Sequence, residues 1–134
     1  MTFVSFASGS SGNCYLLTEG RAAVLLDTGI SLRRIKTGLA RRALTPDDLS
    51  AVLITHEHSD HVAGLPMLLK YYKNVKVYAP QTVAHALERA AAGLEGRIVP
   101  IPVGESVALK NFTLTAFPTM HDTPESVGYV LTGK

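Results

Sequence analysis

The segment from Thr55 to His61 holds three of the five histidines of the chain together with an aspartate, Asp60. Imidazole and carboxylate groups are suitable ligands for Zn²⁺, Fe²⁺ or Mn²⁺. Side chains two residues apart in an extended backbone project to the same side, so His56 and His58 are expected to share one metal site. Asp60 and His61 come after a turn and are expected to face a neighbouring site. The spacing therefore predicts two adjacent metal sites.

Two alternative interpretations of this segment fit it less well. A polar loop without metal would not need three imidazoles and a carboxylate directly after the apolar run 51–54. The helical zinc motif H-E-x-x-H, started at His56, requires a histidine at the position occupied by Asp60.

Four segments in chain order resemble the metallo-β-lactamase superfamily of metal-dependent hydrolases. They are 8–15 (SGSSGNCY), 25–29 (LLDTG), 54–61 (ITHEHSDH) and 120–122 (MHD). The Ser-Gly-Ser-Ser-Gly-Asn opening is most similar to the YycJ/WalJ-like branch. The resemblance implies a fold of the α/β (α+β) class, an αββα sandwich, and it covers essentially the whole chain.

A catalytic Zn²⁺ typically has three protein ligands and an open position for water. His121 follows a strand, as His56 does, and the resemblance places the next metal-binding histidine of the family there. The expected first site is therefore His56, His58 and His121. A metal there would lower the pKa of bound water and create a hydroxide nucleophile. Asp60 would orient that water and bind a second metal together with His61.

Asp27 ends an apolar strand and precedes Thr28-Gly29. An acidic residue at this point is often a cap or turn former. The resemblance instead implies that Asp27 lies close to the metal centre without being a ligand, where its carboxylate would hold a ligand imidazole in the correct tautomer. A serine nucleophile is disfavoured, because Ser10 and Ser11 are in no nucleophile-elbow pattern.

The elements expected to position these residues follow from apolar periodicity and turn residues. Ser31 is a candidate helix N-cap and Gly93 a candidate helix end, and Cys14, the one cysteine, is expected to be buried on a strand without a disulfide. The predicted strands are 2–7, 14–18, 22–26, 51–54, 75–79, 97–103 (at an edge), 106–109, 112–117 and 127–131, the last followed by a turn. The predicted helices are 31–43, a capped turn at 45–48, 64–73 and 82–92.

The helix 31–43 and the loop 8–13 each have two possible interpretations. The helix 31–43 carries five cations and no acid, which suits either a solvated surface or a surface that contacts phosphate groups. The glycine-rich loop 8–13 suits either an anion site or a tight strand connection. His85 lies away from any ligand spacing and is expected to be structural or exposed.

The length of 134 residues predicts a single domain, 1–134, and the net charge of +2 is too small to argue for nucleic acid by itself. No signal peptide or membrane-spanning run is evident, so we expect a cytoplasmic protein. The superfamily completes its second metal site with an aspartate and a histidine downstream of the His121 region. We therefore expect this chain to be the N-terminal half of the sandwich, which would form a homodimer or swapped assembly through its uncovered surface.

The expected function is a metal-dependent hydrolase that acts on phosphodiesters, and the resemblance points to a DNA exonuclease. One or two divalent ions are expected, with Zn²⁺ favoured over Mn²⁺ or Fe²⁺. Two metals about 3.5–4 Å apart suit phosphoryl displacement. Two alternatives remain: hydrolysis of esters, thioesters or lactones at the same site, and a non-catalytic metal-binding fragment.

Overall fold

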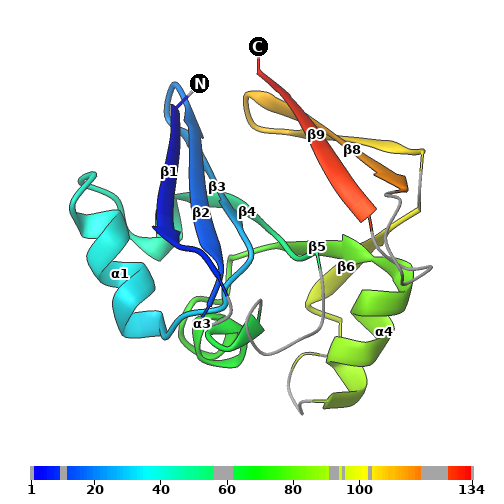
Figure 1. Cartoon of the computed structure of the whole chain (residues 1–134), viewed down its shortest axis with the longest axis horizontal. Helices are drawn as coiled ribbons and strands as arrows, with labels where there is room; N and C mark the ends of the chain where they lie inside the picture. The colour runs from blue at the N-terminus through cyan, green and yellow to red at the C-terminus, as the bar shows by residue number, and fades with distance from the viewer. Residues whose placement is uncertain are drawn as a thin grey trace.

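The chain forms two β-sheets, with helices on the outer side of the larger one (Figure 1). The computed structural model describes residues 2–9, 12–55, 62–90, 94, 96–102, 104–118 and 127–133, with the backbone alone for 90, 116–118 and 127–133.

The larger sheet has six strands in sequence order. The first three strands pair antiparallel, and the third to the sixth pair parallel. They are β1 (Thr2–Ala7), β2 (Cys14–Glu19), β3 (Ala22–Leu26), β4 (Leu49–Leu53), β5 (Val77–Pro80) and β6 (Ile98–Ile101). Parallel strands are covered on both faces, so they are apolar throughout rather than alternating. The sequence AAVLL of β3 follows this rule, and LSAVL of β4 follows it except at the partly buried Ser50.

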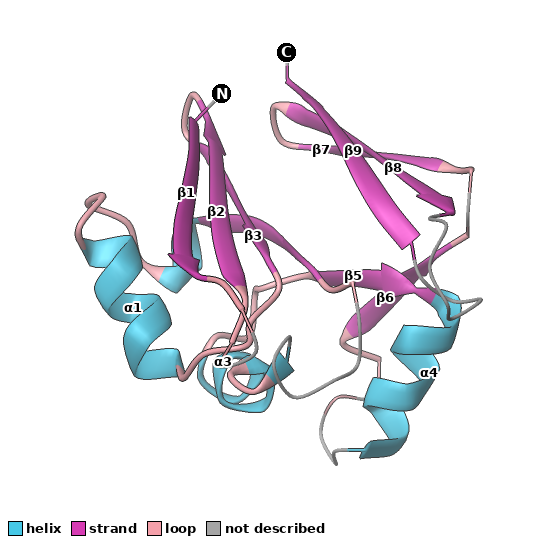
Figure 2. Ribbon diagram, viewed as in Figure 1, coloured by secondary structure: helices cyan, strands magenta, loops and turns pink. Residues whose placement is uncertain are grey.

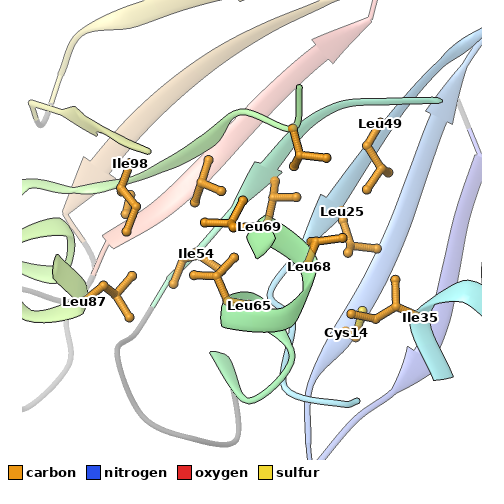
Figure 3. Packing of buried hydrophobic residues seen from close by; sticks show 14 of the residues in the cluster. Cys14, Leu25, Ile35, Leu49, Ile54, Leu65, Leu68, Leu69, Leu87 and Ile98 are labelled. Atoms are coloured by element: carbon orange, nitrogen blue, oxygen red, sulfur yellow. The ribbon is translucent and has the colours of Figure 1, made fainter. Parts of the chain in front are cut away.

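The helices pack on one face of this sheet (Figure 2). They are α1 (Leu32–Ala40), the 3₁₀ turn η1 (Pro46–Asp48), α3 (Leu65–Tyr71) and α4 (Gln81–Ala90). Figure 3 shows Leu65, Leu68 and Leu69 of α3 against Leu25 of β3 and Ile54 beyond β4. In the described part of the chain, no helix combines the length and the apolar character needed to cross a membrane.

The second sheet covers the opposite face. It has three antiparallel strands, β7 (Ser106–Leu109), β8 (Phe112–Pro118) and β9 (Val127–Gly133). Phe112 and Leu114 of β8 are fully buried against Val24 and Leu53 of the larger sheet. Neighbouring residues of β3 and β4 therefore face different cores, as the alternation of side chains along a strand requires.

These layers, helices on a sheet on a second sheet, confirm the fold class expected from the sequence. The predicted hairpins, the N-cap at Ser31 and the edge position of β6 are confirmed as well. The Ser31 hydroxyl accepts a hydrogen bond from the Arg34 amide at 3.2 Å. Cys14 is buried on β2, as predicted.

Some predicted boundaries were wrong. The helix expected over 31–43 ends at Ala40, because Ala43 has a positive φ of 57° and the chain turns there. The Ala43 amide donates to the Ala40 carbonyl at 3.0 Å and the Leu44 amide to the Leu39 carbonyl at 2.9 Å. This pair of bonds is the Schellman pattern that ends many helices.

The turn expected after residue 131 was also wrong, because β9 continues to Gly133 in register with Phe112. Strand β4 begins two residues earlier than predicted, at Leu49, where it pairs with Ala23 of β3. Inter-strand pairing, which no local pattern reports, decided both of these ends.

Candidate metal centre

The parallel strands β3 and β4 are neighbours, so their carboxyl ends lie at the same edge of the sheet. Asp27 follows β3, and Thr55 follows β4 after Ile54. The Asp27 amide donates to the Leu53 carbonyl at 2.7 Å and extends the pairing of the two strands by one step. In open sheets with parallel strands, ligand sites form at this edge.

The Asp27 carboxylate binds Thr55 through both of its oxygens. Oδ1 accepts from the Thr55 amide and Oδ2 from the Thr55 hydroxyl, each at 2.8 Å. Asp27 is only 3% exposed and has a φ of 60°, a conformation that aspartate tolerates better than most residues. Because Thr55 directly precedes His56, these bonds fix the point at which the predicted metal segment begins.

The same turn holds the other end of that segment. The Gly64 amide, three residues after His61, donates to the Thr28 carbonyl at 2.7 Å. A Cβ at position 64 would overlap the carbonyl oxygen of Ile30, so only glycine allows this approach. The segment 56–63 is therefore anchored at both ends to the turn 27–30.

The glycine-rich loop packs against the same turn. The Gly29 amide donates to the Asn13 carbonyl at 2.8 Å, and a Cβ on Gly12 would lie 2.5 Å from the Gly29 carbonyl oxygen. The Asn13 side chain accepts from the Gly9 amide at 3.2 Å and donates to its carbonyl at 3.0 Å. The Gly12 amide also donates inside the loop, to the Gly9 carbonyl. Among the described residues of the loop, the amides of Gly9 and Gly12 are thus used inside the loop, and the choice between an anion site and a tight connection stays open.

The predicted ligands His56, His58, Asp60, His61 and His121 lie outside the described residues. Within the residues that are described, no three histidine, cysteine, aspartate or glutamate side chains gather into a possible metal site. The remaining histidine, His85, is exposed on α4, which agrees with its predicted non-ligand role.

The residues present fit a divalent cation by their chemistry and by their anchoring. Four imidazoles and one carboxylate form the predicted donor set, and these are groups that Zn²⁺, Mn²⁺ and Fe²⁺ accept. The fit also includes Asp27, since residues behind metal ligands commonly fix the ligands in place through hydrogen bonds. Its described contacts are with Thr55, so its predicted contact with a ligand imidazole stays a prediction.

Burial raises the pKa of the Cys14 thiol to about 12, and the negative charge of Asp27 adds to this rise while Arg34 opposes it. A thiol with so high a pKa is protonated at neutral pH, and a protonated thiol is neither a nucleophile nor a good metal ligand. Cys14 is therefore a packing residue of the core.

Sequence reasoning gave no role to Thr55, Thr28 or Gly64, which anchor the metal segment. The bonds that define these roles join residues 28 and 36 positions apart. The one local signal was that two buried strands are each followed within two residues by a short polar side chain, Asp27 and Thr55.

Several curated relatives match this chain over only part of their own length. The exodeoxyribonuclease WalJ of Streptococcus pneumoniae is 42% identical over 84 residues, 63% of this chain and 31% of that protein. The exodeoxyribonuclease YycJ of Bacillus anthracis is 30% identical over 129 residues, 95% of this chain and 48% of that protein. A hydroxyacylglutathione hydrolase of Pectobacterium carotovorum is 34% identical over 82 residues, 61% and 28% of the two chains. The chain thus spans half or less of the length of these relatives.

Among solved structures, a B3 metallo-β-lactamase with an active-site glutamic acid superimposes with a TM-score of 0.75 at 22% identity. The match covers 94% of this chain and 53% of that chain, and it supports the fold. The sequence model of the metallo-beta-lactamase superfamily matches residues 7–133. With the layered fold and this match over nearly its whole length, the chain belongs to the metallo-β-lactamase superfamily.

Proposed function

We propose that the protein containing this chain is a metal-dependent hydrolase that cleaves phosphodiesters, acting as a DNA exonuclease in the cytoplasm. Two relatives that carry the name exodeoxyribonuclease support the choice of substrate. The anchoring of Thr55 by Asp27 supports a fixed metal segment and is the structural observation on which the proposal rests.

In this proposal His56, His58 and His121 hold one divalent cation, and Asp60 and His61 contribute to a second site. A bound cation activates water and stabilises charge on the phosphate that is cleaved. Asp60 orients the attacking water. Asp27 is a positioning residue, because it acts on the site through Thr55 and the backbone that leads into His56.

The donor set does not select among Zn²⁺, Mn²⁺ and Fe²⁺, although Zn²⁺ is the most common cation for imidazole-rich catalytic sites. Plasma mass spectrometry of the purified full-length protein measures the identity and number of bound ions. We expect one or two equivalents of a divalent metal, reduced in His58→Ala and unchanged in His85→Ala.

The activity test uses the full-length protein, a metal supplement and end-labelled single-stranded and duplex DNA. We expect stepwise degradation from an end that is lost in His58→Ala and in Asp60→Ala. His85→Ala is the matched control, because His85 is the exposed histidine of α4 and should be dispensable. Full activity of Asp60→Ala would refute the mechanism.

A panel of esters, thioesters and lactones, assayed with the same metal, separates a nuclease from the alternative suggested by the hydroxyacylglutathione hydrolase relative. Turnover of a thioester with no action on DNA would replace the proposed substrate class. Stoichiometric metal without turnover of any substrate would favour a metal-binding module.

A further inference from the structure

A groove of about 800 Å³ lies between the edge strand β1 and helix α1. Figure 1 shows α1 alongside β1 at the end of the larger sheet. The lining of the groove combines apolar side chains, hydroxyl groups and four arginines. These residues are Val4, Ser5, Phe6, Ile30, Ser31, Arg33, Arg34, Thr37, Gly38, Arg41 and Arg42.

All charged side chains that line the groove are positive. Four of the seven arginines of the protein line it, and all four are exposed. No acidic residue occurs between Asp27 and Asp47. Four positive charges gathered in one groove exceed the net charge of +2 of the whole chain, so the groove is a local site of attraction for anions.

The floor of the groove is apolar and close to the helix backbone. A Cβ on Gly38 would lie 2.8 to 2.9 Å from three ring atoms of Phe6, so glycine lets this ring lie directly against α1. Val4 and Ile30 continue the apolar surface. Arginine side chains beside an apolar surface suit a single nucleic-acid strand. The arginines can bind its phosphates, and its bases can stack on the apolar surface.

One end of the groove lies at the turn that anchors the metal segment. Ile30 and Ser31 line the groove and directly follow Asp27-Thr28-Gly29. The carbonyl oxygen of Ile30 also lies against Gly64, the far anchor of the metal segment. A strand bound in the groove would therefore contact the turn 27–30 through Ile30.

We propose that this groove binds the sugar–phosphate backbone of a single DNA strand and guides it toward the metal segment. The identity of the occupant rests on the proposed function. A peptide that adds to the free edge of β1 would use backbone hydrogen bonds and would not need four arginines, so the charge favours DNA.

The test is fluorescence anisotropy with a labelled oligothymidylate and full-length protein in EDTA, so that binding is measured without metal or cleavage. The variant Arg41→Gln/Arg42→Gln removes two charges from the groove. Lys70→Gln/Arg89→Gln is the matched control, because it removes two charges from α3 and α4, away from the groove.

Each phosphate contact of a single strand contributes about 0.7 to the slope of log K against log salt, so the groove variant should lose about 1.4 of slope and roughly tenfold in affinity at 0.15 M salt. Arg33→Gln should lose about 0.7 of slope and gives an independent check. The control pair should bind as the parent does. Equal losses in both double variants, or an unchanged slope in the groove variant, would overturn the proposal.

Two further outcomes separate this groove from the proposed function. Salt-dependent binding that is lost in the groove variant, with no hydrolysis of DNA under any metal, would support the groove and refute the exonuclease. Hydrolysis of DNA that is equal in the parent and the groove variant, with equal affinity, would support the exonuclease and overturn the groove. Displacement of the DNA by an uncharged, strand-forming peptide without salt dependence would also overturn it, in favour of strand pairing at β1.

Discussion

Asp27 and Thr55 are the residues through which the sheet acts on the metal segment. Both oxygens of a buried carboxylate are directed at one residue, so the position and the orientation of Thr55 are constrained together. A hydrogen bond to a charged group contributes about 1.5–3 kcal/mol, more than a bond between neutral groups. Thr55, the last described residue before His56, is thereby held more firmly than by bonds between neutral groups alone.

Replacing Thr55 by valine removes the hydroxyl bond and keeps the shape and the backbone bond. We expect Thr55→Val to reduce the free energy of unfolding by about 1.5–3 kcal/mol, measured by urea denaturation of the metal-free protein. Thr55→Ser keeps the hydroxyl and is the matched control, with a smaller loss. Full stability of Thr55→Val, with a loss only in Thr55→Ser, would mean that the methyl packing matters and the bond to Asp27 does not.

The raised pKa of the Cys14 thiol predicts that the free energy of unfolding depends on pH in the alkaline range. Its pKa in the folded chain is about 12, against an ordinary value of 9.0. The folded state therefore keeps the proton over a range where the unfolded state releases it, and the free energy of unfolding falls as pH rises from about 9 toward 12. One proton contributes a slope of at most about 1.4 kcal/mol per pH unit.

The measurement compares the parent with Cys14→Ala by urea denaturation between pH 8 and pH 10.5. Lysines and tyrosines titrate in both proteins, so the difference between the two curves isolates the thiol. We expect the parent to lose stability more steeply above pH 9. Parallel curves would show that the thiol titrates alike in the folded and unfolded chains.

At the level of elements, the backbone conformation just after α1 is energetically unfavourable at one residue, Ala43. Ala43 adopts a φ of 57°, which costs a residue with a Cβ roughly 1–2 kcal/mol compared with glycine. We expect Ala43→Gly to raise the free energy of unfolding by about 1 kcal/mol, measured by thermal and urea denaturation. Ala40→Gly is the control within the helix, where glycine should destabilise by about 1 kcal/mol. Destabilisation by both changes would mean that the turn at Ala43 is not formed.

Helix α3 shows how an element far along the chain supports the same site. Its first residues follow Gly64, the anchor of the metal segment, and its last carbonyls accept hydrogen bonds from Arg97. The guanidinium group donates to Leu69 at 2.9 Å and to Tyr72 at 3.2 Å. A cation at a helix C-terminus is favourable, so both ends of α3 are held by other elements.

At the level of the whole molecule, each sheet ends in free edges. The larger sheet ends at β1 and β6, and the smaller at β7 and β9. The smaller sheet presents Ser106, Thr113 and Thr115 outward in its described part, and the hydroxyls of Ser106 and Thr115 lie 2.7 Å apart.

We expect the isolated 134-residue chain to form a homodimer or a swapped assembly, measured by light scattering coupled to size exclusion at several concentrations. Free strand edges provide the pairing groups for such an assembly. A concentration-independent monomeric mass would contradict this prediction.

The amino-acid pattern by itself determined the existence of the strands, the N-cap at Ser31 and the burial of Cys14, and it predicts the kinds of ligand in the metal segment. Each of these depends on neighbours within a few residues: alternation along a strand, a hydroxyl three residues from an amide, or imidazoles at a short spacing. The ligand set and its metal are still predictions, since His56 to His61 and His121 lie outside the described residues.

The tertiary structure alone decided which distant residues meet. The bonds from Asp27 to Thr55 and from Thr28 to Gly64 exist because β3 and β4 pair in parallel, and the basic groove exists because α1 lies against the edge strand β1. Such contacts follow from the strand order, which buries both faces of β3 and β4. The strand order is favoured because it reduces the exposed apolar surface of the whole chain, so it cannot be predicted from any local stretch of sequence.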